Sequence, residues 1–282
     1  MQSIKKTLDR YYKEFNFSER LKHDPVEFPR RYADPDDIEV AGFIASCFAY
    51  GKVELFRPVI EKILLLGGSN PGNYFRKFSL KKDEKYIKRI SYRFNRGQDV
   101  LCFLYLLKQT LTEWGSLKNL FYYHYKPDHE DIRSALNGFV TSFLNRDTSP
   151  VNGRNTRPRG LTQLLSVPEK GSACKRMNLF LRWMVRRKDV DMGIWKKISP
   201  SQLIIPLDTH ISRISRCIGL TNRAAADWKT AREITEALKQ LDPADPLKYD
   251  FVLCHKGISG KCKGEKSITV CSSCILSPCR QF

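Results

Sequence analysis

The stretch DPDDIEVAGFIASCFA, residues 34–49, predicts the helix at the centre of the fold. Asp34 is of the residue type that caps a helix N-terminus, and Pro35 fits the first helical turn. Asp36 and Asp37 follow beside the positive end of the helix dipole, which carboxylates stabilise. The residues after them are apolar on almost every face, as in helices that are buried all round. We therefore expect this helix to lie inside the protein.

Helical periodicity continues along most of the chain, whereas no stretch shows strand alternation between hairpin turns. The polar stretch 147–160, rich in Pro, Gly and Arg, is the best internal boundary. We expect an all-α protein. Beyond the central helix, the predicted helices cover residues 54–66, 97–113, 116–125, 129–145, 175–187, 209–218, 228–240 and 246–257.

The charge of the chain indicates an anionic partner. Over 282 residues, 49 Lys and Arg against 30 Asp and Glu give a formal net charge of +19. Such a surplus attracts phosphate backbones or anionic lipid, and release of counterions makes the binding salt-dependent. From Pro150 to Lys188 there are ten basic residues and one acid, Glu169. These features favour a nucleic acid over a basic surface without a specific partner.

The apolar content is that of a folded globular protein, with 41% hydrophobic residues. No apolar run approaches the roughly 20 residues that span a bilayer. The N-terminal stretch MQSIKKTLDRYYKEF, residues 1–15, lacks the apolar core of a secretion signal. We expect a cytoplasmic protein.

The nine cysteines fall into two groups. Those that stand singly in apolar helical sequence are expected to be small buried hydrophobes, as is Cys254 within the last predicted helix. Cys262, Cys271, Cys274 and Cys279 give the spacing C-x8-C-x2-C-x4-C near the C-terminus. In a reducing compartment this pattern predicts a metal site, and either zinc or a four-iron cluster would offset the repulsion of four thiolates.

The segment VPEKGSACKRMNLFLRWMV, residues 167–185, begins with turn residues and continues as a helix with one apolar face. Lys175 lies in the first turns of that helix, where the dipole disfavours an ammonium group. A lysine kept neutral in such a place can act as a nucleophile. Taken alone, a solvent-exposed lysine beside Arg176 remains the simpler interpretation.

The stretch IIPLDTH, residues 204–210, places Asp208 between an apolar run and the next helix. Asp208 is a good N-cap, and its residue type alone favours capping over catalysis. Spacing alone does not connect it to Lys175.

The two segments together resemble the helix-hairpin-helix base-excision DNA glycosylases. GSACKRMNLFL, residues 171–181, is similar to the hairpin and lysine helix of endonuclease III, including Asn178. PLDTHISRISRCIGL, residues 206–220, resembles the segment that supplies the family's aspartate. The separation of 33 residues between Lys175 and Asp208 is closer to the archaeal 8-oxoguanine glycosylases. The whole arrangement is also similar to an uncharacterised bacterial family with expected glycosylase-like members.

The resemblance implies a role for further residues. EVAGFIASCFAYGKVELFRPVIEKIL, residues 39–64, is similar to the paired helices that open the glycosylase core. Tyr50 then falls where the family inserts a wedge residue into the duplex, although an ordinary helix-end aromatic is an equal alternative. Asp250 would line the base pocket, unless it is a surface or capping carboxylate. The residues expected to contact DNA are Tyr50, Gly171, Ser172, Arg176, Arg154, Arg157 and Arg159, although a solvated loop is the simpler interpretation of the last three.

The resemblance also implies a two-lobed domain organisation. Residues 34–219 would form a glycosylase-like helical core with the hairpin near 167–185. Residues 1–33 and 220–282 would form a second lobe that carries the C-terminal cysteine loop. One departure is Ala173, which occupies the place of the family's second hairpin glycine and restricts the backbone there.

The implied function is a DNA glycosylase with β-lyase activity, in which Lys175 forms a Schiff base and Asp208 stabilises the developing charge. The substrate would be double-stranded DNA with an oxidised base, 8-oxoguanine-like, or an abasic site, bound by a monomer. The resemblance favours a 4Fe-4S cluster over zinc at the four cysteines. The alternative is a non-catalytic nucleic-acid-binding protein that retains the scaffold. A metal-dependent nuclease is weaker because no carboxylate or histidine cluster has ligand spacing.

Overall fold

The computed structural model describes residues 2–259 and 274–276, and in these ranges the chain forms helices and no β-strand. The expected all-α class is therefore confirmed for the described chain. Its helices are α1 (Gln2–Glu14), α2 (Phe17–Leu21), α3 (Pro35–Phe48), α4 (Val53–Gly67), α5 (Pro71–Arg76), α6 (Leu80–Ile87), α7 (Gly97–Trp114), α8 (Leu117–His124), α9 (Arg133–Leu144), α10 (Ser149–Asn152), α11 (Arg159–Leu164), α12 (Lys175–Val185), α13 (Thr209–Cys217), α14 (Trp228–Lys239) and α15 (Asp250–Ile258).

The helices that sequence periodicity missed are mostly short. α5 and α6 follow the Gly-rich end of α4, and α10 interrupts the stretch that was predicted to be a connector. The last predicted helix begins as a 3-10 turn, Pro246–Tyr249, before α15 continues it. α5 and α10 are too short to show an apolar stripe, and α6 buries one residue, Ile87.

Helix α3 is the centre of the fold, as its sequence predicts. The Asp34 side chain accepts a hydrogen bond from the Asp36 amide at 2.8 Å, and the helix is buried from Asp37 to Phe48. The Phe43 ring meets four other phenylalanine rings at centroid distances of 5.3–6.0 Å: Phe103, Phe139, Phe143 and Phe180. These rings come from α7, α9 and α12, so α3 joins three helices that are distant in the sequence.

A buried carboxylate in α3 ties together two more segments. Glu39 accepts hydrogen bonds from the Leu117 and Lys118 amides, at 2.6 and 3.0 Å, and from the Trp195 indole at 2.9 Å. It therefore caps the N-terminus of α8 together with Ser116, whose hydroxyl accepts from the Asn119 amide at 3.1 Å. Burial raises the pKa of Glu39 to about 7, against the opposing effect of these donors.

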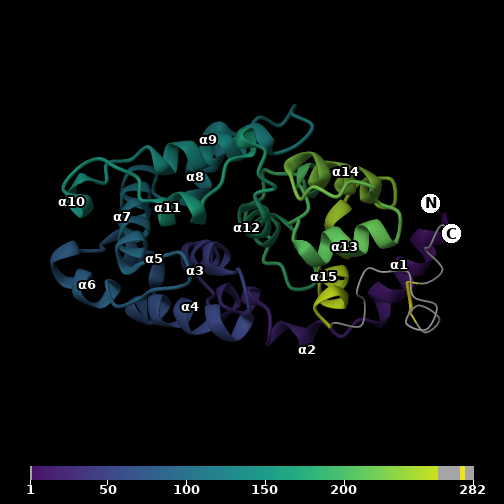
Figure 1. The fold of residues 1–282 in the computed structure, drawn as a ribbon, viewed down its shortest axis with the longest axis horizontal. Helices are drawn as coiled ribbons and strands as arrows, with labels where there is room; N and C mark the ends of the chain where they lie inside the picture. The colour runs from purple at the N-terminus through teal and green to yellow at the C-terminus, as the bar shows by residue number, and fades with distance from the viewer. Residues whose placement is uncertain (1, 260–273, 277–282) are drawn as a thin grey trace.

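The helices form two groups joined by α12 (Figure 1). α4 to α11 gather around α3 on one side, and α13, α14, α15 and the N-terminal α1 lie on the other. α1 is attached to the later group by Asp9, which accepts from Lys248 and Tyr249, each at 2.7 Å. Among the described helices, none is long and apolar enough to cross a membrane.

A buried ion network links α12 to the second group. Arg182 pairs with Asp191 at 3.2 Å and with Asp250 at the start of α15. Arg186 pairs with Asp191 as well and with Asp245 at 2.8 Å. Burial raises the pKa of both Asp191 and Asp250, and the arginines counteract it. Each carboxylate thus depends on a guanidinium for its charge.

We expect Arg182→Met to lower the free energy of unfolding by about 3–5 kcal/mol, because Asp250 and Asp191 would lose a partner while still buried. Urea unfolding followed by circular dichroism measures the change. Arg232→Met is the control: its pair with Glu130, at 2.7 Å, is exposed and should contribute less than about 1 kcal/mol. A loss as small for Arg182→Met as for the control would contradict the prediction.

Candidate functional site

Lys175 is the first residue of α12, where the predicted hairpin ends. The preceding 3-10 helix, Pro168–Lys170, closes at Gly171, whose φ is +79°, and Cys174 has a φ of +47°. The left-handed residue next to Lys175 is therefore Cys174 and not Ala173, where the family's second glycine was expected. A non-glycine residue is strained in this conformation, and such strain gathers at functional sites.

Contacts within and beyond the hairpin hold it in place. The Ser172 hydroxyl donates to the Ser166 hydroxyl at 2.9 Å and accepts from the Cys174 amide at 3.2 Å. The Trp228 amide at the start of α14 donates to the Gly171 carbonyl at 3.0 Å. The buried Asn178 side chain donates to the Ala173 carbonyl at 3.0 Å. The asparagine that the sequence comparison singled out thus closes the hairpin onto its helix.

The Lys175 side chain is half-buried and reaches back to α3. Its Nζ donates to the carbonyl of Ala49, the residue that ends α3, at 3.2 Å. This contact fixes the amine at the junction of α3 and α12.

Asp208 caps α13, as predicted. Its Oδ1 accepts from the amides of His210 and Ile211, both at 2.9 Å, and the side chain is half-buried. Asp208 forms no ion pair with Lys175 at 4 Å or less, both residues lying in the described chain.

The thiol of Cys254 on α15 lies close enough to Lys175 and Asp208 for both to act on it. Its Sγ is 3.9 Å from Asp208 Oδ2. Burial raises the thiol pKa well above its usual range; the charges of Asp208 and Asp250 raise it further, while the charge of Lys175 lowers it. The lysine and the aspartate, which no sequence spacing connected, therefore both lie within electrostatic range of one thiol.

Sequence reasoning placed Cys254 in the core and missed its position beside Asp208. The available signal was its spacing from Asp250, because residues four apart share one face of a helix. Asp250 is 2% exposed and paired with Arg182, so it is not a surface carboxylate. Its role in a base pocket stays a prediction.

Tyr50 and Arg176 lie beside this cluster. The Tyr50 hydroxyl donates to the Tyr92 carbonyl at 3.1 Å and contacts the Asn95 side chain. The Arg176 guanidinium lies 5.1 Å from the Tyr50 ring centroid and donates to the Cys47 carbonyl at 3.2 Å. Burial lowers the pKa of Arg176, although the nearby thiol and phenol groups counteract it. Both residues are half-buried and engaged with the protein.

A tight turn over residues 92–95 extends from Tyr50 toward solvent. The amides and carbonyls of Tyr92 and Asn95 bond to each other, both at 2.8 Å, and Arg93 has a φ of +51°. Asn95 is fully buried and donates to the Gly160 carbonyl at 2.7 Å. Phe94 at the tip is 68% exposed. A rigidly held turn thus presents an aromatic ring to solvent, which sequence patterning did not indicate.

The remaining predicted residues are farther from this cluster. Arg154, Arg157 and Arg159 are exposed near α10 and α11, and Arg157 donates to the Leu144 carbonyl at 2.6 Å. Of the predicted metal ligands, Cys274 is half-buried. Cys262, Cys271 and Cys279 lie outside the described residues.

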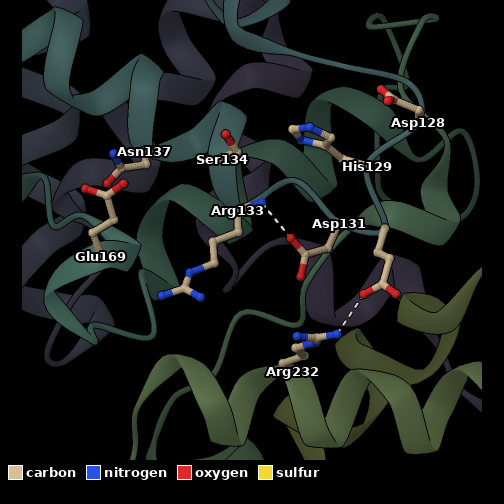
Figure 2. A pocket seen from close by; sticks show the side chains of 9 residues that line it. Asp128, His129, Asp131, Arg133, Ser134, Asn137, Glu169 and Arg232 are labelled. Atoms are coloured by element: carbon tan, nitrogen blue, oxygen red, sulfur yellow. Dashed lines mark hydrogen bonds and ion pairs between the residues drawn. The ribbon is translucent and has the colours of Figure 1, made fainter.

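A surface pocket of about 660 Å³ opens at the N-terminus of α9. Figure 2 shows Arg133, Ser134 and Asn137 on one side and Arg232 of α14 opposite them. Glu169, which precedes the hairpin, also contributes. Side chains of both charges line this pocket. Lys175, Asp208 and Cys254 are not among its lining residues.

Comparison with models of known protein families gives one match. A model of the family described as "protein of unknown function (DUF2400)" matches residues 24–259. The chain belongs to this family. The DUF2400 match includes Lys175, Asp208 and Cys254 and ends before Cys262. No curated protein and no solved structure matches the chain.

Proposed function

We propose that this DUF2400 protein is a DNA glycosylase with β-lyase activity. The observation that carries the proposal is the convergence of Lys175, at the start of α12, and Asp208, the cap of α13, on one thiol. An amine and a carboxylate that both act on one thiol are the two types of group that glycosidic bond cleavage needs. The helix-hairpin-helix resemblance of residues 167–219 supports the same interpretation.

In the proposed reaction the neutral Lys175 amine attacks C1′ of the extruded nucleotide. The bond from C1′ to the base breaks, and the base leaves with the bonding electrons and takes up a proton. The amine then loses one proton, the bond between C1′ and the ring oxygen breaks, and the ring oxygen takes up a proton, which leaves a protonated Schiff base. Loss of the C2′ proton then expels the 3′ phosphate by β-elimination. Asp208 Oδ2, which the cap leaves available, stabilises positive charge on the sugar and accepts a lysine proton.

The surface around the cluster suits DNA. Phe94 stands on a turn flanked by Arg93 and Arg96, both exposed, and an exposed ring among cations is a platform for a nucleic-acid base. The net charge of +19 supports a phosphate-rich partner. We propose double-stranded DNA with an oxidised base, 8-oxoguanine-like, or an abasic site, bound by a monomeric protein in the cytoplasm. The hairpin residues Gly171 and Ser172 and the arginines near α11 would contact phosphates.

For the C-terminal cysteines we propose a 4Fe-4S cluster, with zinc as the alternative. Cys262, Cys271, Cys274 and Cys279 supply four thiolates, a donor set that suits both. Such a site would position basic residues against DNA and would take no part in the cleavage.

The second candidate is a nucleic-acid-binding protein without catalytic activity. The contact that favours it is the Lys175 Nζ hydrogen bond to the Ala49 carbonyl, which also fits a structural lysine. Covalent trapping separates the two candidates.

We expect borohydride to trap the protein on a duplex with an abasic site, through the Schiff base. Lys175→Ala should abolish trapping, because it removes the amine that forms the Schiff base. Asp208→Asn should slow trapping by about 100-fold while α13 keeps its cap, because asparagine also caps helices. The Asp227→Asn variant is the control, since Asp227 is also a helix cap and accepts from the Thr230 amide at the start of α14. No trapping with the unsubstituted protein would exclude the lyase, and trapping with Lys175→Ala would assign another nucleophile.

We expect Phe94→Ala to weaken binding to the same duplex by about tenfold, the range of one base–aromatic stack. Fluorescence anisotropy at several salt concentrations measures the affinity and its salt dependence. Tyr123→Ala on α8 is the control, because Tyr123 is similarly exposed, at 70%, outside the turn. Equal affinities for the two variants would remove Phe94 from the DNA surface.

We expect anaerobically purified protein to contain about four iron and four sulfide ions per chain. Cys271→Ser should lose them, whereas Cys102→Ser, at a buried cysteine in α7, should keep them. Stoichiometric zinc without sulfide would favour the alternative.

A further inference from the structure

The two carboxylate oxygens of Asp208 have different partners. Oδ1 accepts from both capping amides, of His210 and Ile211. Oδ2 faces the Cys254 thiol, with 3.9 Å between oxygen and sulfur. Both capping amides donate to the same oxygen, so the cap alone does not fix the rotation of the carboxylate about its Cβ–Cγ bond. Rotation about this type of bond has a broad energy minimum.

The Cys254 thiol is the donor in this contact. Its pKa is raised well above its usual range by burial and by the charges of Asp208 and Asp250, with Lys175 opposing, so the sulfur keeps its proton at neutral pH. A carboxylate can only accept, and a thiol is a weak donor. The S–H group therefore donates to Oδ2.

The packing of α13 against α15 fixes where this thiol lies. A Cβ at Gly257 would lie 2.6 Å from the Cβ of His210, so the two helices meet closely there. The Arg213 side chain donates to the Gly257 carbonyl at 3.0 Å. One turn before Cys254, Asp250 is paired with Arg182. Contacts on both sides therefore hold Cys254 in register with the cap.

We propose that Cys254 is a positioning residue that orients Oδ2 of Asp208 toward the sugar. This inference rests on the proposed glycosylase function, in which Oδ2 is the oxygen that meets the substrate. The cap fixes one oxygen and the thiol fixes the other, so the carboxylate plane is set before DNA binds. Such preorganisation of a charged group is what stabilises charge in a transition state.

The contact itself is tested without any activity. The intact protein is alkylated with iodoacetamide at one neutral pH, and the rate at Cys254 is followed by mass spectrometry of its peptide. Asp208→Asn should raise that rate at least about threefold, because the neighbouring negative charge that disfavours the thiolate is gone. Asp227→Asn, a cap on α14, should leave it unchanged. An unchanged rate in Asp208→Asn would overturn the contact.

The positioning role is tested by borohydride trapping with substitutions of Cys254. Cys254→Ala should slow trapping by about tenfold at unchanged affinity for abasic DNA, and Cys254→Ser, which restores a donor, should recover most of the rate. Equal rates for Cys254→Ala and the unsubstituted protein would overturn the role, as would Cys254→Ser being as slow as Cys254→Ala. If the unsubstituted protein is not trapped, the proposed function fails, and with it the role, while the alkylation result still decides the contact.

Discussion

The packing of α12 on α3 is the constraint on which the candidate site depends. The two helices cross so closely that a Cβ at Gly42 would lie 2.9 Å from Met184 Cε. This crossing brings the N-terminus of α12 to the C-terminus of α3, so that Lys175 meets the Ala49 carbonyl. A side chain at position 42 would have to displace the flexible end of Met184, and one larger than that movement accommodates would disturb the crossing.

On its other side α12 is also held by charges. Arg182 and Arg186 face buried carboxylates from the segment after α12 and from the start of α15. Buried ion pairs stabilise a fold little more than apolar side chains of the same size would. An arrangement that leaves one of the buried charges unpaired is, however, strongly destabilised. α15 is thereby held in register with α12, and Cys254 arrives beside Asp208.

Much of the fold could be read from local patterns. The cap at Asp34, the apolar faces of α3 and α7, and the cap at Asp208 follow from residue type and periodicity, and each helix is where these place it. The short α5 and α10 contain too few turns to show a periodic face, and α6 buries one residue, Ile87, so it has no apolar stripe to recognise. At the site, the resemblance selected Lys175 and Asp208 as a pair, but it gave no partner for either. Cys254 and Phe94 stood out in neither the motif nor the periodicity.

The sequence by itself determined the all-α class and the starts of α3, α7 and α13, because these depend on neighbours along the chain. The two residues that the proposed chemistry needs came from the resemblance of residues 167–219. Tertiary structure alone decided that the Tyr50 hydroxyl points into the 92–95 turn and leaves Phe94 at the surface. It also decided that a thiol 46 residues beyond Asp208 donates to its second oxygen. The physical reason is that such contacts join helices through packing and buried charge. The local sequence around one residue does not indicate which distant residue it will contact.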